Sequence, residues 1–259
     1  WPYGGPSVSL NDAAKRIRKI TLKSASGSFQ IPKLKPEERV VALFDGIKSI
    51  SESELKLLPA EARPYVIVIG PTYMKVKRAS LGAEGYVIDH YNLTALNHYL
   101  ENVISKLIKA SPKGLSSIFC DSLEVYNSNW TDDLPSEFQK RRKYDILSRL
   151  PELIDESLKG AMQVRFDFWR TLAELHEERF TKPLGEWCRK NGVKLEMEEY
   201  GTPPAPLKSY EHIDVPTGEQ YEWKGFSFSR YPASGAHLAG KNKIGAEAWT
   251  WTGIPNRLA

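Results

Sequence analysis

Apolar runs that end in acidic residues recur along the second half of this chain. Residues 118–126 start with an apolar run and then carry Asp121 and Glu124, three positions apart. Two further strand-like runs end in the same way, at Glu198 and Glu247. A parallel strand that is covered on both faces is apolar along its length, and the functional side chains of an α/β barrel collect at the C-terminal ends of its strands. The pattern therefore predicts strands that deliver carboxylates to one rim.

Helical periodicity separates these runs. Residues 93–109 and 166–191 place apolar side chains at helical spacing, and Pro183 predicts a kink or a break in the second of them. Residues 233–239 predict a further short helix, and a capped helix start is expected at 13–18. Strands that alternate with helices indicate an α/β fold with a parallel sheet.

The first third of the chain has a different character. Short apolar runs at 40–44 and 65–69 are separated by Gly, Pro and Ser, which is typical of β structure with turns. We interpret residues 21–87 as a small β-rich insertion. Residues 1–20 and 88–259 then form part of a catalytic (β/α)8 TIM-type barrel that is incomplete in this chain.

Composition narrows the function classes. The 259 residues are enough for one large core, and the 36 basic and 32 acidic residues leave a net charge of +4, too small and scattered to indicate nucleic-acid binding. No apolar run reaches the length that crosses a bilayer. Cys120 and Cys188 have no metal-ligand spacing and are expected to be packed thiols. The five histidines do not suggest a zinc site. The chain opens at Trp1 without an initiator methionine or a signal peptide, and we expect it to be a piece of a longer protein.

Carboxylates and aromatic side chains on separate strands suggest a site that cleaves sugars. Glycoside cleavage needs a proton donor and a second carboxylate that acts on water or on the anomeric carbon. Glu124 follows an apolar strand, where partial burial would raise its pKa and keep it protonated. Alternatively, it caps the next turn or pairs with Arg141 or Arg142. Glu247 lies between two alanines that let a ligand approach closely, or it forms a buried salt bridge.

Other residues are candidates for substrate binding. Glu198 shares one face of its strand with Glu196 and Tyr200 by period-two alternation, and it lies nearer the C-terminal end. Glu219 follows a turn and, taken alone, is an exposed loop acid. Tryptophans near the acids either stack on sugar rings or pack in the core. The substrate-binding candidates are Asp121, Glu198, Glu219, Trp130, Trp249 and Trp251.

Several segments, in this order, resemble glycoside hydrolase family 106, whose characterised members are α-L-rhamnosidases. The resemblance covers most of the chain and is specific only when the segments are taken together. The segments are residues 1–6, 70–79, 82–90, 119–126, 165–172, 215–219 and 246–251.

The resemblance implies a (β/α)8 barrel that releases L-rhamnose with inversion, with the help of a bound calcium ion. The acidic site residues of the family would fall on Asp121, Glu124, Glu219 and Glu247. Glu124 would be the general acid and Glu247 the general base, while Glu219 would bind calcium or sugar hydroxyls.

The family members are far longer than this chain. The resemblance therefore implies that the first barrel strands, most of the β insertion and the accessory domains are missing from it. It also implies a periplasmic or extracellular location and, as substrate, a rhamnose-containing oligosaccharide, polysaccharide or glycoside. Two alternatives stay open: a retaining TIM-barrel glycosidase that acts on another sugar, and a non-catalytic carbohydrate-binding fragment.

Overall fold

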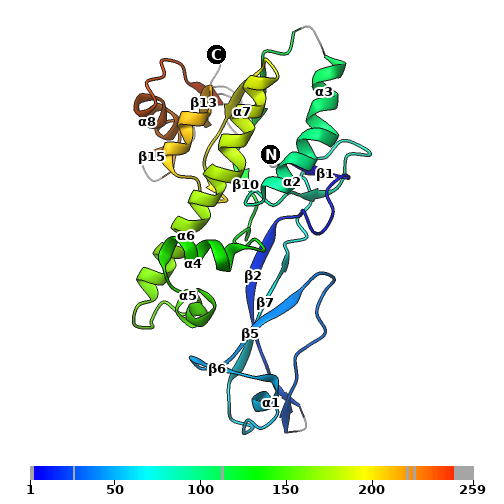
Figure 1. Cartoon of the computed structure of the whole chain (residues 1–259), viewed down its shortest axis with the longest axis vertical. Helices are drawn as coiled ribbons and strands as arrows, with labels where there is room; N and C mark the ends of the chain where they lie inside the picture. Colours follow the sequence, from blue (N-terminus) through cyan, green and yellow to red (C-terminus); the bar gives the residue numbers. More distant parts are fainter. Residues whose placement is uncertain (1–2, 26, 112–113, 220–221, 224–225, 248–259) are drawn as a thin grey trace.

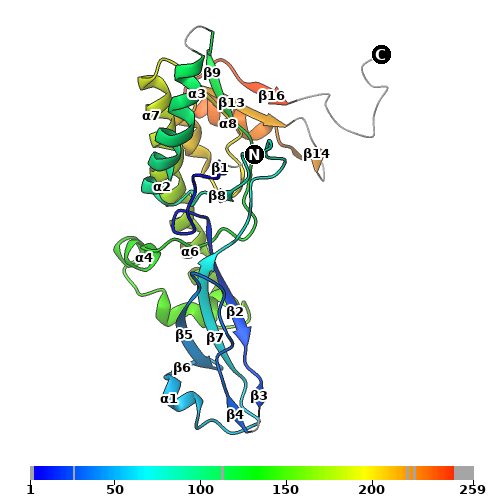
Figure 2. The same ribbon diagram turned by 90° about the vertical axis from the view of Figure 1, so that its right-hand side faces the viewer.

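The described residues form two lobes, and one long helix runs along both of them (Figure 1). The computed structural model describes residues 3–25, 27–111, 114–219, 222–223 and 226–247. One lobe holds a parallel sheet with helices against it, and the other holds an antiparallel sheet with further helices beside it (Figures 1 and 2).

The parallel sheet contains the strands that the acid-ending runs predict. Its order is β16-β13-β11-β9, and all three neighbouring pairs are parallel. The α/β prediction with a parallel sheet is confirmed. Within the described residues these strands form an open sheet and not a closed eight-stranded barrel. The strands are β9 (Ser117–Cys120), β11 (Lys194–Met197), β13 (Val215–Glu219) and β16 (Gly245–Glu247).

Helices cover one face of this sheet (Figure 2). The strand side chains Cys120, Leu195 and Met197 point into a core cluster that the helices complete with Leu96 and Leu184. Cys120 and Cys188 are both buried free thiols, as expected. The helices of this lobe are α2 (Leu93–Tyr99), α3 (Ser105–Ala110), α7 (Lys182–Lys190), η4 (Leu207–His212) and α8 (Arg230–Leu238).

The long helix continues through the position where Pro183 predicted a kink or a break. It consists of α6 (Ala161–His176), a π-helical turn η3 (Glu177–Thr181) and then α7. Pro183 falls in the first turn of α7, directly after the wide π turn, where its missing N–H is tolerated. A second π turn, η1 (Leu100–Ile104), joins α2 to α3 in the same way.

The antiparallel sheet has the order β2-β7-β5-β6. The helix start expected at residues 13–18 is wrong, because these residues enter strand β2, which pairs with β7 along its whole length. This pairing overrides the local capping signal. The sheet therefore begins at Lys15, within the segment that the sequence assigned to the barrel. Its strands are β2 (Lys15–Thr21), β5 (Arg39–Asp45), β6 (Lys48–Ile50) and β7 (Pro64–Pro71).

Every residue of β7 is buried, because both of its faces are covered. Tyr65, Ile67 and Ile69 pack against a cluster from the helices, while Val66 and Val68 pack against a cluster on the opposite face. The helices that flank the first face are α4 (Leu134–Arg142), η2 (Leu147–Arg149), α5 (Leu150–Ile154) and α6. The remaining elements are β1 (Gly4–Gly5), β3 (Ser24–Ala25), β4 (Ser28–Phe29), α1 (Glu52–Leu55), β8 (Tyr86–Val87), β10 (Leu123–Glu124), β12 (Gly201–Thr202), β14 (Glu222–Trp223) and β15 (Phe226–Ser227).

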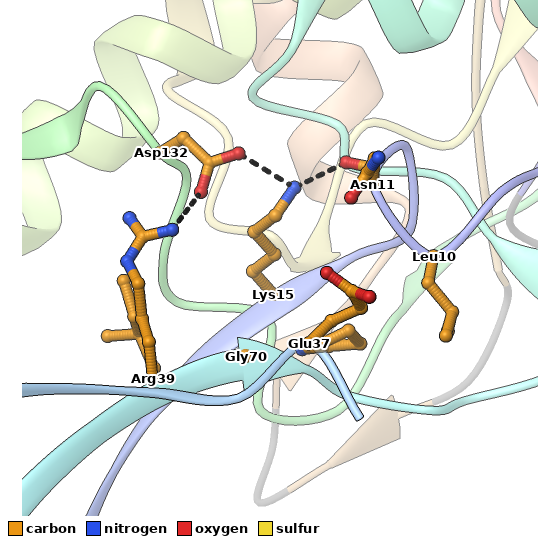
Figure 3. A pocket seen from close by; sticks show the side chains of 9 residues that line it. Leu10, Asn11, Lys15, Glu37, Arg39, Gly70 and Asp132 are labelled. Carbon is orange, nitrogen blue, oxygen red and sulfur yellow. Dashed lines mark hydrogen bonds and ion pairs between the residues drawn. The ribbon is translucent and has the colours of Figure 1, made fainter. Parts of the chain in front are cut away.

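A buried lysine ties the start of β2 to the loops beside it (Figure 3). The Lys15 Nζ lies 2.6 Å from the Asn11 carbonyl oxygen, 3.3 Å from Asp132 Oδ2 and 3.8 Å from Asp89 Oδ2. Asp89 is itself buried and accepts a hydrogen bond from the Thr131 hydroxyl. Burial raises the pKa of Asp89 to about 6, although Lys15 opposes this shift. Among the described helices, none is both long and apolar enough to cross a membrane.

Candidate active site

Four neighbouring parallel strands each bring one carboxylate to the same edge of the sheet. Asp121 follows β9 and Glu198 follows β11, while Glu219 and Glu247 are the last residues of β13 and β16. One carboxylate oxygen from each of Asp121, Glu198 and Glu247 lies within 4.8 Å of the other two. The sequence prediction that these acids share one rim is therefore matched by their positions in the structure.

A small residue keeps two of these strands close together. A Cβ atom added to Gly245 of β16 would lie 2.4 Å from the Thr217 hydroxyl on β13. This hydroxyl also lies 3.2 Å from Glu196 Oε1 of β11. Glu196 thus contacts the neighbouring strand one level below the strand ends.

Burial and mutual repulsion raise the pKa values of two carboxyl groups. Glu198 is 0% exposed, and burial raises its pKa to about 7, with smaller contributions from Asp121, Glu219 and Glu247. The pKa of Glu219 is also raised, first by burial and then by Glu247, Asp121 and Glu124. These carboxylates therefore influence one another as one electrostatic group.

Tyr200 links two of the strand ends, and the sequence interpretation did not assign it a role in the site. Its Oη lies 2.7 Å from Glu198 Oε2, and the backbone N–H of Glu219 donates to the same Oη over 2.9 Å. Burial and the nearby Glu198 carboxylate raise the pKa of the Tyr200 phenol far above its usual value. The signal in the sequence was the alternation that places Tyr200 on the same face as Glu198.

Glu124 forms an ion pair with a lysine that the sequence did not predict. It lies on β10, which pairs with β12 beyond the main sheet, and its side chain is 37% exposed. Its Oε2 lies 2.8 Å from Lys77 Nζ, and this contact raises the pKa of Lys77. Glu124 is half-buried, in line with the partial burial that the sequence predicts. Lys77 was missed because it comes from a loop 47 residues away in the sequence.

The alternative partners of Glu124 have other contacts. Arg141 forms ion pairs with Glu137 and Glu178, and Arg142 pairs with Glu174, all on the helices of the other lobe.

The tryptophans divide into one core residue and two that lie outside the described residues. Trp130 is 1% exposed and packs in the second lobe with Phe138 and Phe168. Its indole is enclosed by core side chains, so the prediction that it stacks on a sugar is corrected in favour of core packing. Trp249 and Trp251 fall outside the described residues.

The residues present suit a hard cation. Asp121, Glu198 and Glu247 supply oxygen ligands, which calcium prefers. Glu198 Oε1 is buried and has no hydrogen-bond partner, so a bound cation would satisfy it. Glu219, which was predicted to bind the metal, is not one of these three residues, although it lies beside Glu247 on the next strand. A second group, Glu177, Glu211 and His212, lies on the surface, where Lys208 already pairs with both glutamates.

Comparison with known proteins places the chain among glycoside hydrolases. The model of the family Glyco_hydro_106, described as alpha-L-rhamnosidase, matches residues 55–258. A protein of Formosa agariphila named "Putative beta-glucuronidase" is 30% identical over 194 residues, which cover 71% of this chain and 16% of that protein. The structure of a rhamnosidase from Novosphingobium sp. PP1Y aligns with a TM-score of 0.59 at 24% identity, over 74% of this chain and 20% of that chain.

The chain thus spans a small part of the length of the relatives that it matches. The family match covers most of the chain and includes all four strands that carry the clustered carboxylates. The chain belongs to glycoside hydrolase family 106, the family described as alpha-L-rhamnosidase.

Proposed function

We propose that this chain carries part of the catalytic site of an inverting α-L-rhamnosidase, which releases terminal L-rhamnose from α-L-rhamnosides. The observation that supports the proposal best is the set of carboxylates at the ends of four adjacent parallel strands. Family membership supports glycoside hydrolysis, and inversion requires two carboxylates that act on opposite faces of the sugar.

Glu124 acts as the general acid in this proposal. Its side chain is partly exposed, so it can approach a leaving oxygen at the rim. Its contact with Lys77 must open or shift when it carries the proton, since an ammonium group favours an ionised carboxylate.

Glu247 acts as the general base. It lies at the end of β16 within the carboxylate cluster, and only small residues precede it on the strand. A carboxylate has two oxygens, so one oxygen of Glu247 can face a cation while the other accepts a proton from water. Glu219, on the neighbouring strand, is placed to bind a sugar hydroxyl.

Asp121, Glu198 and Glu247 would hold the calcium ion. Bound calcium would coordinate vicinal sugar hydroxyls and orient them, and its positive charge would offset the repulsion between the carboxylates. Two observations support this choice: Tyr200 donates a hydrogen bond to Glu198, and one carboxylate oxygen from each of the three residues lies within 4.8 Å of the other two.

The name of the Formosa agariphila relative raises a second candidate, a β-glucuronide substrate. A glucuronide brings its own carboxylate to strand ends that already carry four. Like charges repel strongly where water is scarce, so a neutral 6-deoxy sugar fits this edge better.

The test is to incubate the full-length protein with 4-nitrophenyl α-L-rhamnoside and, separately, with 4-nitrophenyl β-D-glucuronide. We expect hydrolysis of the rhamnoside, with β-L-rhamnose as the first anomer seen by proton NMR. Initial release of α-L-rhamnose would show retention. Hydrolysis of the glucuronide but not of the rhamnoside would show that the substrate is a β-glucuronide. Sugar binding without turnover of any aryl glycoside would favour a non-catalytic carbohydrate-binding role.

A further inference from the structure

The Tyr200 hydroxyl lies between two neighbouring strand ends. It is 2.7 Å from the Glu198 carboxylate, which follows β11, and 2.9 Å from the backbone nitrogen of Glu219 at the end of β13. The ring of Tyr200 is held in place from outside the sheet, where it stacks on Tyr231 with 6.0 Å between ring centroids and packs on Phe228.

The direction of these two hydrogen bonds follows from their chemistry. A backbone N–H only donates, so the Tyr200 oxygen must accept from Glu219. The hydroxyl hydrogen of Tyr200 is then directed to Glu198, whose Oε2 must accept it. The bridge therefore assigns Oε2 of Glu198 to Tyr200 and leaves the other oxygen for a different partner.

The other oxygen of Glu198 has no hydrogen-bond partner. Oε1 is buried on a side chain that is 0% exposed. A buried polar atom without a partner is rare and calls for water, a ligand or an ion. One carboxylate oxygen from each of Asp121, Glu198 and Glu247 lies within 4.8 Å of the other two, so an ion held among them could contact all three residues.

We infer that Tyr200 is a positioning residue, which holds Glu198 by Oε2 so that Oε1 is presented as a ligand for a divalent cation. This inference rests on the proposed function for the identity of the cation, calcium. Tyr200 touches neither the cation nor the substrate, and it acts through the orientation of Glu198.

A double-mutant cycle tests this inference, with the calcium affinity of the full-length protein measured by calorimetry. Tyr200→Phe removes the hydroxyl and should weaken calcium binding by roughly tenfold, because a hydrogen bond to a charged group is lost. Glu198→Gln keeps an acceptor for Tyr200 but loses ligand charge, and it should also weaken binding. If Tyr200 acts through Glu198, Tyr200→Phe causes no further loss of affinity in the Glu198→Gln background.

A purely structural role of Tyr200 gives a different result. The same fold-loss in both backgrounds would overturn the inference, and so would wild-type protein that binds no calcium. Tyr144→Phe is the matched control, because Tyr144 donates a similar hydrogen bond to Asp167 over 3.0 Å in the other lobe. This variant should bind calcium as the wild type does.

The assay of α-L-rhamnoside hydrolysis separates the two proposals. An intact cycle in a protein that hydrolyses no rhamnoside would contradict the proposed function and support the role of Tyr200. If the protein hydrolyses rhamnosides but the two substitutions have additive effects on calcium affinity, the proposed function is supported and the role of Tyr200 is contradicted.

Discussion

Glu219 of β13 and Glu247 of β16 occupy the same level of two neighbouring parallel strands. Their side chains therefore lie on the same face of the sheet, and Glu247 contributes to the raised pKa of Glu219. Two acids in this relationship are unfavourable for stability alone, because like charges at partnered positions repel. The pair gives a physical reason to look for function at this edge.

The acid role of Glu124 predicts a dependence on the leaving group. Glu124→Gln should slow the hydrolysis of rhamnosides with poor leaving groups by roughly 10²–10³-fold, since these need a proton on the departing oxygen. Activated aryl rhamnosides should lose much less. The measurement is kcat/KM across a series of leaving groups, and equal losses along the series would rule out Glu124 as the acid.

The base role of Glu247 predicts losses that do not depend on the leaving group. Glu247→Gln should lower the rate by about 10²–10⁴-fold for both activated and poor leaving groups, because water must be deprotonated in either case. A strong dependence on the leaving group would move the acid role to Glu247. Glu101→Gln, on an exposed helix surface, serves as the control.

Calcium removal should abolish turnover, and calcium should restore it better than magnesium, which requires a smaller and more regular octahedral site. Asp121→Asn should weaken calcium binding more than Glu219→Gln, because Asp121 belongs to the three closest carboxylates. A larger loss of calcium affinity in Glu219→Gln than in Asp121→Asn would indicate that Glu219 is the metal ligand. Full activity in excess chelator, with no metal found by elemental analysis, would remove calcium from the mechanism.

The raised pKa of Glu198 predicts how stability changes with pH. The folded state holds the proton of Glu198 up to about pH 7, whereas a glutamate in the unfolded chain loses it near its ordinary value. The free energy of unfolding in chelator should therefore fall by up to about 3 kcal/mol as the pH rises through this window. Glu198→Gln should remove this dependence, as measured by urea unfolding between roughly pH 4.5 and 7.5. An unchanged slope would show that Glu198 is ionised in the folded protein throughout.

The buried lysine of β2 predicts a large effect on stability. Lys15→Met leaves the buried Asp89 without its cation and should cost about 2–4 kcal/mol in the free energy of unfolding. Lys48→Met, whose exposed ammonium pairs with Glu54, should cost less than about 1 kcal/mol. Similar losses for the two variants in urea unfolding would show that the Lys15 contacts contribute little.

Strand positions and the edge that carries the acids could be predicted from the sequence, because an apolar run that ends in a carboxylate is a local pattern. The runs before Asp121, Glu198 and Glu247 indeed became β9, β11 and β16. The start of β2 could not be predicted in this way, since its conformation depends on pairing with β7, about fifty residues later.

Most contacts of the site side chains could not be predicted from the sequence. The Lys77–Glu124 pair joins a loop to strand β10, and only the fold brings the two together. Trp130 lies close to the acids in sequence, but its indole is directed to the core of the other lobe. Alternation within residues 193–200 places Tyr200 on the same face as Glu198, but it does not reveal the hydrogen bond from the backbone of Glu219 on β13.

The π turn between α6 and α7 has a consequence for insertions and deletions. The buried side chains of α6 follow one another by three or four residues up to Leu175, and the next buried apolar position, Phe180, comes five residues later. The extra residue in the π turn changes the direction in which the buried side chains point. Those of α6 therefore face the core of the antiparallel lobe, and those of α7 face the core beside the parallel sheet. Removing a single residue from 177–181 would rotate everything after it by about 100° relative to α6. Surface loops in general tolerate insertions and deletions, whereas this helix must keep its residue count for both cores to form.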